Sequence, residues 1–448
     1  MSKPTATPGL FRLTWPILIE TLLHVGTGTV STLMVSRLSD QAVGALGVAN
    51  QLLGMAITLF QVVAIGSVVV VGQRLGAGDR AAVQRAATVA LAINALLGLV
   101  VGLVLAGMAP SLLAWMNLPT AMQPEAGLYL RVVGAGIVTE ALMLSLSAIL
   151  RAHGHARDGM VVTFGVNVLV MLGNALLIFG LAGLPKLGVL GAALSTLGGR
   201  AAGLIALYWL FRRRLGFAPS RRYIESDWRN HLARILAIGL PAAGEMLSWS
   251  GMFALVTSFT ARLGHTALVA QSYALQIVWL MVTFVQALGA ATEIITAHLV
   301  GAGNLNEAYR QLLRSLRLGL GVTLLLAGLV TIGGRTFIGW FSQDGEVIDL
   351  AGHVLALSLL LETGRVFNMI VIGALRAAGD ARFPFHMGLV SMWGIAVPLA
   401  WLFGLKLGWG LVGIWLALAA DEWIRGLTML ARWRSRAWVG KALVHGQG

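Results

Sequence analysis

The amino-acid sequence predicts an all-α polytopic membrane protein with twelve transmembrane helices in two six-helix lobes, related by a pseudo-twofold axis along the membrane normal. Three observations predict this fold: the composition, a series of long apolar stretches and an internal repeat. Of the 448 residues, 57% are hydrophobic and 11% are charged. Soluble domains carry roughly 25% charged residues, so this composition is typical of a chain dissolved in lipid.

The apolar stretches are long enough to cross about 30 Å of hydrocarbon, and we expect six in each half of the chain. In the first half we expect helices at 10–35, 46–73, 86–108, 126–150, 159–181 and 187–211. In the second half we expect them at 235–260, 270–299, 313–334, 350–375, 384–404 and 409–431. The first stretch continues past residue 30 with no cleavage site, which predicts an uncleaved first helix.

The charged residues indicate orientation in the membrane. The formal net charge is +14, but Lys and Arg cluster at helix ends and favour the even-numbered connections. The positive-inside rule therefore predicts cytoplasmic N- and C-termini, in a bacterial inner membrane. Because the basic residues are not gathered on one soluble face, we expect no nucleic-acid partner. The sequence has no cysteine, which excludes disulfides, thiolate catalysis and Cys-ligated zinc.

The two halves of the sequence repeat each other. At an offset of 225 residues the matching pairs include Pro16 with Pro241, Glu20 with Glu245, Gln51 with Gln276, Gly76 with Gly301, and Arg151 with Arg376. After the loop between the fifth and sixth helices the offset becomes 222, and Gly191 meets Gly413. We therefore predict an N-lobe at 1–225 and a C-lobe at 226–448. Repeats of six helices run parallel, and a site is expected between them near the bilayer midplane.

Four short motifs, in order, resemble the multidrug and toxic compound extrusion (MATE) family. They are Leu75 to Asp79 after the second stretch, the repeated loops beginning at Leu150 and Leu375, and Asn174 to Gly180 with the glycines that follow. The resemblance covers about residues 8–432. It implies export of drugs or toxic organic compounds, often cationic, in exchange for H⁺ or Na⁺, by alternating access of two lobes.

The sequence departs from that family at its familiar coupling acids. Ser31 stands where many members carry an aspartate in the first helix, and Asn174 where archaeal members carry one in the fifth. Arg365 stands where other members carry an aspartate in the tenth helix. The family's cation site therefore cannot be carried over to this sequence. The metal ion that we expect as a possible ligand is Na⁺, as one of the two coupling ions.

Two acid–base pairs are predicted from the repeat. Glu140 aligns with Arg365 at the offset of 225, and Arg200 aligns with Glu422 at the offset of 222. Each lobe thus has one acid and one base at the same two positions, with the signs exchanged. A charge at the bilayer centre costs at least about 2.5–3.5 kcal/mol, so we predict two structural ion pairs, Glu140–Arg200 and Arg365–Glu422.

Glu20 and Glu245 are predicted to bind the coupling cation. Each follows a proline by four residues, and a proline in a helix frees backbone carbonyl groups nearby. A carboxyl group removed from water can load and unload a proton. Glu293, near the end of the eighth expected helix, is a third candidate. The alternative for Glu20 and Glu245 is that each accepts hydrogen bonds from Thr or Ser and stabilises a bent helix, and the alternative for Glu293 is a hydrated position at the cytoplasmic rim.

Side chains around Glu245 predict a substrate cavity for flat, often cationic compounds. The candidates are Trp249, Met252, Tyr273, Gln276, Trp279 and, from the first helix, Ser31. Aromatic faces attract cations, and flexible methionines adapt to varied shapes. The alternative for the aromatic residues is packing against lipid or anchoring at the membrane interface.

The sequence contains no GxxxxGK[ST] loop, two-histidine metal spacing or nucleophile–base arrangement. We therefore expect a protein that is not an enzyme and that uses no cofactor besides its coupling ion, H⁺ or Na⁺. We expect a monomer surrounded by membrane lipid, with small organic molecules as substrates. A lipid-linked saccharide flippase would favour extra helices and an arginine-rich cavity, and a membrane scaffold or receptor is disfavoured by the short loops.

Overall fold

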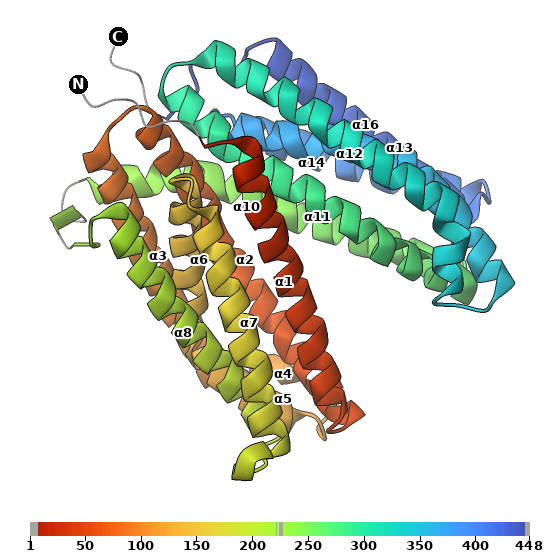
Figure 1. The fold of residues 1–448 in the computed structure, drawn as a ribbon. Coiled ribbons are helices and arrows are strands. Elements are labelled where there is room, and N and C mark those ends of the chain that lie inside the picture. Colours follow the sequence, from red (N-terminus) through yellow and green to blue (C-terminus); the bar gives the residue numbers. More distant parts are fainter. Residues whose placement is uncertain (1–7, 221, 224–226, 444–448) are drawn as a thin grey trace. The chain divides into compact units, whose positions relative to one another are not determined.

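Every regular element in the described part of the chain is a helix. The computed structural model describes residues 8–220, 222–223 and 227–443 (Figure 1). The earlier elements are α1 (Leu10–Ser36), α2 (Asp40–Gly76), α3 (Arg80–Gly107), α4 (Ala109–Trp115), α5 (Gln123–Ala135), α6 (Val138–Ala152), α7 (Ala156–Phe179), η1 (Leu181–Gly183) and α8 (Val189–Leu215). The later elements are α10 (Trp228–Arg262), α11 (His265–Gly301), α12 (Leu305–Gly339), α13 (Gly345–Ala377), α14 (Arg382–Ser391), η2 (Met392–Ala396), α15 (Val397–Ala400), η3 (Trp401–Lys406) and α16 (Gly410–Arg434). The all-α prediction is confirmed.

Each of the twelve expected spans falls on a helix or on an interrupted run of helices. Within the described residues, nine runs are long and apolar enough to cross a membrane, and a tenth span is formed by α5 and α6, which meet at 48°. The remaining two are α10 and α16, with 35 and 25 residues. Both carry ionisable residues in their middle, which lower their hydropathy. Such charges need partners inside the protein.

Two spans are interrupted, which the sequence analysis did not predict. Gly136 and Ile137 separate α5 from α6, so Glu140 lies in the first turn of α6. The N-terminal end of a helix carries a partial positive charge, and this position therefore stabilises a carboxylate. In the eleventh span, the π-helical elements η2 and η3 flank α15, which contains Pro398. Proline has no backbone N–H to donate, and the wider π turns accommodate the interrupted hydrogen-bond ladder.

The chain divides into two compact units. The first unit comprises residues 15–71 and 79–239, and the second comprises 72–78, the chain from Leu240 onward and the described residues up to Thr14. The last turns of α2 belong to the second unit because Gln73 Nε2 donates to the Ala377 carbonyl at 2.6 Å and Gln73 Oε1 accepts from Leu443 N at 2.9 Å. The predicted lobe boundary at 225 and 226 lies outside the described residues.

Close helix packing in each unit depends on glycine. A β-carbon at Gly199 of α8 would lie 2.5 Å from Cγ2 of Val170 on α7. In the second unit, a β-carbon at Gly426 of α16 would lie 2.8 Å from Cβ of Phe367 on α13. Small residues let helix backbones approach in membranes, where contact and packing drive association. Helices α8 and α16, which carry Arg200 and Glu422, are therefore held close to their neighbours α7 and α13.

Candidate transport site

The first unit contains a cavity of about 500 Å³. Helices α1, α2, α5, α6, α7 and α8 contribute its walls, which mix apolar and polar side chains. The polar and ionisable lining residues are His24, Thr27, Ser31, Thr32, Asn50, Tyr129, Glu140, Thr163, Asn167, Asn174, Thr196 and Arg200. Pockets for small organic molecules typically measure about 300–1,000 Å³ and combine apolar walls with a few polar groups. This cavity has the size and composition of such a pocket.

Polar side chains on facing helices are joined across the wall of this cavity. Arg200 Nε on α8 lies 3.1 Å from Glu140 Oε2 on α6, so the structure brings together the predicted pair. Asn174 Nδ2 on α7 donates a hydrogen bond to Ser31 Oγ on α1 at 3.3 Å. Two buried atoms, Arg200 Nη1 and Asn174 Oδ1, have no hydrogen-bond partner in the described chain. The wall therefore offers a donor and an acceptor that a bound molecule can satisfy.

Glu20 lies in the first unit but is not among the lining residues of the cavity. Its Oε2 atom lies 3.9 Å from Arg151 Nη1 at the end of α6. The carboxylate lies beside Gly159 of α7, where an added β-carbon would be 3.4 Å from Glu20 Oε2. Within the described chain no Thr or Ser hydroxyl donates to it. Glu20 is thus held by an arginine and not by the hydroxyl groups of the alternative interpretation.

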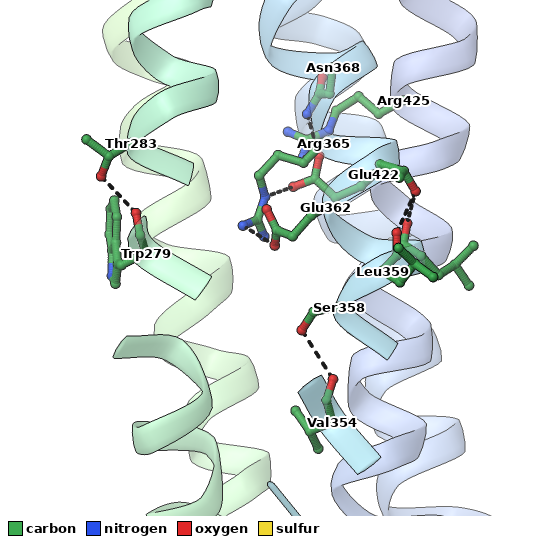
Figure 2. Close-up of polar contacts among 12 residues, drawn as sticks. Trp279, Thr283, Val354, Ser358, Leu359, Glu362, Arg365, Asn368, Glu422 and Arg425 are labelled. Atoms are coloured by element: carbon green, nitrogen blue, oxygen red, sulfur yellow. Dashed lines mark hydrogen bonds and ion pairs between the residues drawn. The ribbon is translucent and has the colours of Figure 1, made fainter. Parts of the chain in front are cut away.

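The second unit contains a chain of alternating charges between α13 and α16 (Figure 2). Arg425 Nη2 lies 3.2 Å from Asp421 Oδ2 and 3.2 Å from Glu422 Oε2. Arg365 continues the chain, with Nε 3.2 Å from Glu422 Oε1 and Nη1 2.8 Å from Glu362 Oε1. The predicted partners Arg365 and Glu422 are therefore brought together. They form the centre of a longer network, named here the charge chain: Asp421, Arg425, Glu422, Arg365 and Glu362.

Glu245 differs from its counterpart in the first repeat. Glu20 is paired with Arg151, but the matching arginine of the second repeat, Arg376, is paired with Glu293 on α11, with Nη2 3.1 Å from Oε2. In the described residues Glu245 has no ion pair or hydrogen bond, and Arg376 acts on it only as a more distant charge. Of the three predicted cation-binding glutamates, Glu245 is therefore the one whose carboxylate is not already engaged by an arginine.

The aromatic residues predicted for the substrate cavity occupy several different environments. Trp249 and Met252 line a cavity of about 20 Å³ in the second unit, room for a single water molecule. Tyr273 packs on Phe341, with ring centroids 5.7 Å apart. The exposed members of the set are Gln276 and Trp279. Their role in binding substrate stays a prediction, and the ligand-sized cavity described above is lined by one member of the set, Ser31.

Arg151 and Arg376 pair with intramembrane glutamates, which we did not predict from the sequence. Both arginines stand in the repeated Leu-Arg-Ala motif, and Glu20 and Glu245 stand at matching positions of the first and seventh spans. This double match was a signal that an acid and a base belong together. The repeat could not predict that Arg376 pairs with Glu293 in the second half, because the first half has Val68 at the position that matches Glu293.

Paired six-helix units with polar groups buried among their helices define a class of membrane proteins, the duplicated secondary transporters. The chain matches the MatE family over residues 16–176 and 241–402, one match in each repeat. It belongs to this family. It is 40% identical over 444 residues to the "Uncharacterized transporter YisQ" of Bacillus subtilis strain 168, covering 99% of this chain and 98% of that protein. It is 30% identical to the "Probable multidrug resistance protein NorM" of Pseudomonas putida, covering 99% and 97%.

Solved structures share the fold. A MATE crystal structure in the bent conformation matches with a TM-score of 0.84 and 21% identity, covering 95% of this chain and 94% of that one. A transporter of the MOP superfamily from Pyrococcus furiosus Vc1 matches with a TM-score of 0.83 and 21% identity, covering 97% and 98%. The predicted family and the predicted fold class of twelve helices in two lobes are both confirmed.

Proposed function

We propose that this chain is a secondary-active exporter of the bacterial inner membrane, with both termini in the cytoplasm. It moves small organic compounds, often cationic, out of the cell in exchange for H⁺ or Na⁺. The family match supports a transporter and not an enzyme. The multidrug resistance name of the relative at 30% identity supports organic compounds as the substrate class.

The observation that carries the proposal is the unengaged carboxylate of Glu245. An intramembrane acid without a partner is costly, so it is retained where it binds something. Arg376 and Arg425 are the cationic groups whose charges act on Glu245. A proton or Na⁺ that binds Glu245 removes its attraction to both arginines. That change in local charge biases the conformational equilibrium of the protein, which is what coupling requires.

The substrate occupies the 500 Å³ cavity of the first unit. Its lining combines Tyr129 and Met143 with the Glu140–Arg200 pair. A cationic group of the substrate can approach the Glu140 carboxylate, and the unpaired Arg200 Nη1 can donate to an acceptor on the same molecule. Substrate and coupling ion thus bind in different units, which makes their effects separable by mutation.

The test uses purified protein in proteoliposomes loaded with ethidium or norfloxacin, with proton and Na⁺ gradients imposed separately. Glu245→Gln is expected to abolish efflux driven by whichever gradient works in the wild type, while substrate still binds and protein yield is unchanged. The matched control is Glu346→Gln, which removes an exposed carboxylate at the start of α13. Wild-type efflux rates in Glu245→Gln would refute the proposal.

The flippase alternative is not favoured by the geometry. An arginine that binds the phosphates of a lipid-linked saccharide must be free of carboxylates. Arg200 lies 3.1 Å from Glu140, and Arg365 lies within 3.2 Å of Glu422 and 2.8 Å of Glu362. The charges of Arg200 and Arg365 are therefore each balanced by an acid of the same unit, although Arg200 Nη1 keeps a free N–H.

A further inference from the structure

The ionisable side chains that interact around α13 and α16 in the second unit include more acids than bases. The acids are Glu245, Glu293, Glu362, Asp421 and Glu422, and the bases are Arg365, Arg376 and Arg425. Glu293 and Arg376 neutralise each other at 3.1 Å. Glu245 accounts for one of the two excess negative charges. The other belongs to the charge chain, which alternates in sign but begins and ends with an acid.

The two ends of the charge chain are not equivalent. Asp421 accepts from Arg425 at 3.2 Å and also accepts a hydrogen bond from the Ser391 hydroxyl. Glu362 has its Oε1 atom 2.8 Å from Arg365, but its Oε2 atom is buried without a hydrogen-bond partner among the described residues. The Glu362 side chain is 0% exposed. A buried charge costs several kcal/mol unless it is paired and hydrogen-bonded, so the excess charge is least tolerated at Glu362.

The surroundings of Glu362 do not supply the missing positive charge. The charges that act on it are those of Arg365 on its own helix and Glu422 on α16. Arg425 and Asp421 lie behind Glu422 on α16 and pair with each other. On α11 the acid is Glu293, which is already paired with Arg376.

We propose that Glu362 is a second proton-binding site, which takes up and releases a proton independently of Glu245. A proton on Oε2 makes the charge chain neutral and leaves the Arg365 contact at Oε1 in place. Proton binding by Glu362 does not depend on the proposed function. Only its effect on transport rests on that function.

A small cavity beside the charge chain has room for one water molecule. This cavity, about 20 Å³, is lined by Arg365, Asp421 and Glu422 together with Gln271 and Trp415. Gln271 Oε1 and Trp415 Nε1 are buried and have no hydrogen-bond partner in the described chain. A site of this size with several polar partners suits one water molecule, which would accept from the indole N–H and donate to the amide oxygen. Such a water connects the chain of charged groups to the neighbouring helix.

The test is infrared spectroscopy of the full-length protein in lipid, reading the C=O stretch of protonated carboxyl groups. Glu362→Gln is expected to remove one such band at neutral pH, whereas Glu245→Gln leaves that band in place and Glu346→Gln leaves all bands of protonated carboxyl groups unchanged. Glu362→Asp is the second variant if Glu362→Gln yields no folded protein. It should move the band, because aspartic and glutamic acid absorb at different frequencies.

The band must also respond to pH. In the wild type it should disappear reversibly as the pH is raised, and the protein should lose thermal stability over the same range, because the chain then holds an unpaired negative charge. Glu362→Gln, which stays neutral, should not show that loss. An unchanged carboxyl band in Glu362→Gln or an unmoved band in Glu362→Asp would overturn the proposal, as would a band that persists at every pH where the protein is folded. Normal efflux by Glu245→Gln would instead count against the proposed function and leave the infrared result intact.

Discussion

The two repeats use the same arginine in different ways. In the first, Arg151 lies 3.9 Å from Glu20, the acid that the repeat supplies. In the second, Arg376 lies 3.1 Å from Glu293, an acid that the first repeat lacks, and Glu245 is left without an ion pair among the described residues. Because Arg376 pairs with Glu293, it is not available to Glu245. The acid that the repeat supplies is thus paired with an arginine in the first unit and, among the described residues, has no ion pair in the second.

The same contrast extends to the charge chain. At the offset of 225, Glu362 stands where the first repeat has Ile137, and at the offset of 222, Asp421 and Arg425 stand where it has Gly199 and Gly203. In the first repeat the two glycines allow close packing of α7 and α8 and Ile137 lies in the break between α5 and α6, whereas the second repeat has ionisable groups at all three positions. The comparison teaches that two copies of one six-helix arrangement can differ in charge, with the excess acid in only one of them. The ligand-sized cavity lies in the neutral copy.

The largest expected effect comes from reversing one sign in the first repeat. Glu140→Arg places two arginines together, and removing one partner of a buried pair typically costs about 3–5 kcal/mol, with the lower end expected here because the pair borders a cavity. Little folded protein should result, measured as monodisperse yield and thermal stability in detergent. The double variant Glu140→Arg with Arg200→Glu should recover much of it, since it recreates the order that Arg365 and Glu422 already have.

A control for that reversal is the exposed pair of Arg214 and Asp158, with Nε 2.9 Å from Oδ2. Exposed pairs contribute about 0–1 kcal/mol, so Arg214→Glu should change stability little. If Glu140→Arg is no more harmful than Arg214→Glu, the pair in the cavity wall has no structural role. Glu140 and Arg200 would then be candidates for a direct role in transport.

The second prediction concerns a mutation, Glu293→Gln, that should make the pairing in the second repeat like that in the first. Glu293→Gln frees Arg376, whose charge already acts on Glu245, and the arginine should then pair with Glu245 as Arg151 pairs with Glu20. We expect folded protein that binds substrate but no longer responds to an imposed gradient, measured by efflux from proteoliposomes. Gradient-driven efflux at the wild-type rate would show that Glu293 does not control Glu245.

The third prediction concerns packing at a position where the second repeat carries an acid. Gly199→Ala puts a methyl group 2.5 Å from Val170 Cγ2, and overpacking of this kind costs about 1–3 kcal/mol. The neighbouring Gly198 is the matched control, because no atom lies within 4 Å of an added β-carbon there. Thermal unfolding should show a loss for Gly199→Ala and none for Gly198→Ala. Equal stabilities for the two variants would argue against tight contact of α7 and α8.

The smallest effect is expected at Glu20. Because Arg151 already neutralises it, Glu20→Gln should slow gradient-driven efflux less than Glu245→Gln does, when both are measured in the same proteoliposomes. The reverse order, with Glu20→Gln inactive and Glu245→Gln normal, would assign the coupling ion to the first unit. Equal and complete loss in both variants would show that the two carboxylates act together.

Much of the architecture follows from the sequence because its causes are local or periodic. Apolar stretches of membrane length predict helices wherever they occur, and the twelve expected spans fall on observed helices. The repeat adds long-range information, since two copies of one fold must place matching residues alike. That argument predicted the pairing of Glu140 with Arg200 and of Arg365 with Glu422, both seen at ion-pair distance.

Other features were decided by the tertiary structure alone. The break at Gly136 and Ile137, the cavity behind it and the choice of Glu293 by Arg376 depend on how helices distant in sequence meet. Hydropathy describes one helix at a time, and it does not say which of several acids an arginine can reach. An ion pair forms where two side chains come within about 4 Å, a distance set by helix packing and by the glycines that permit it.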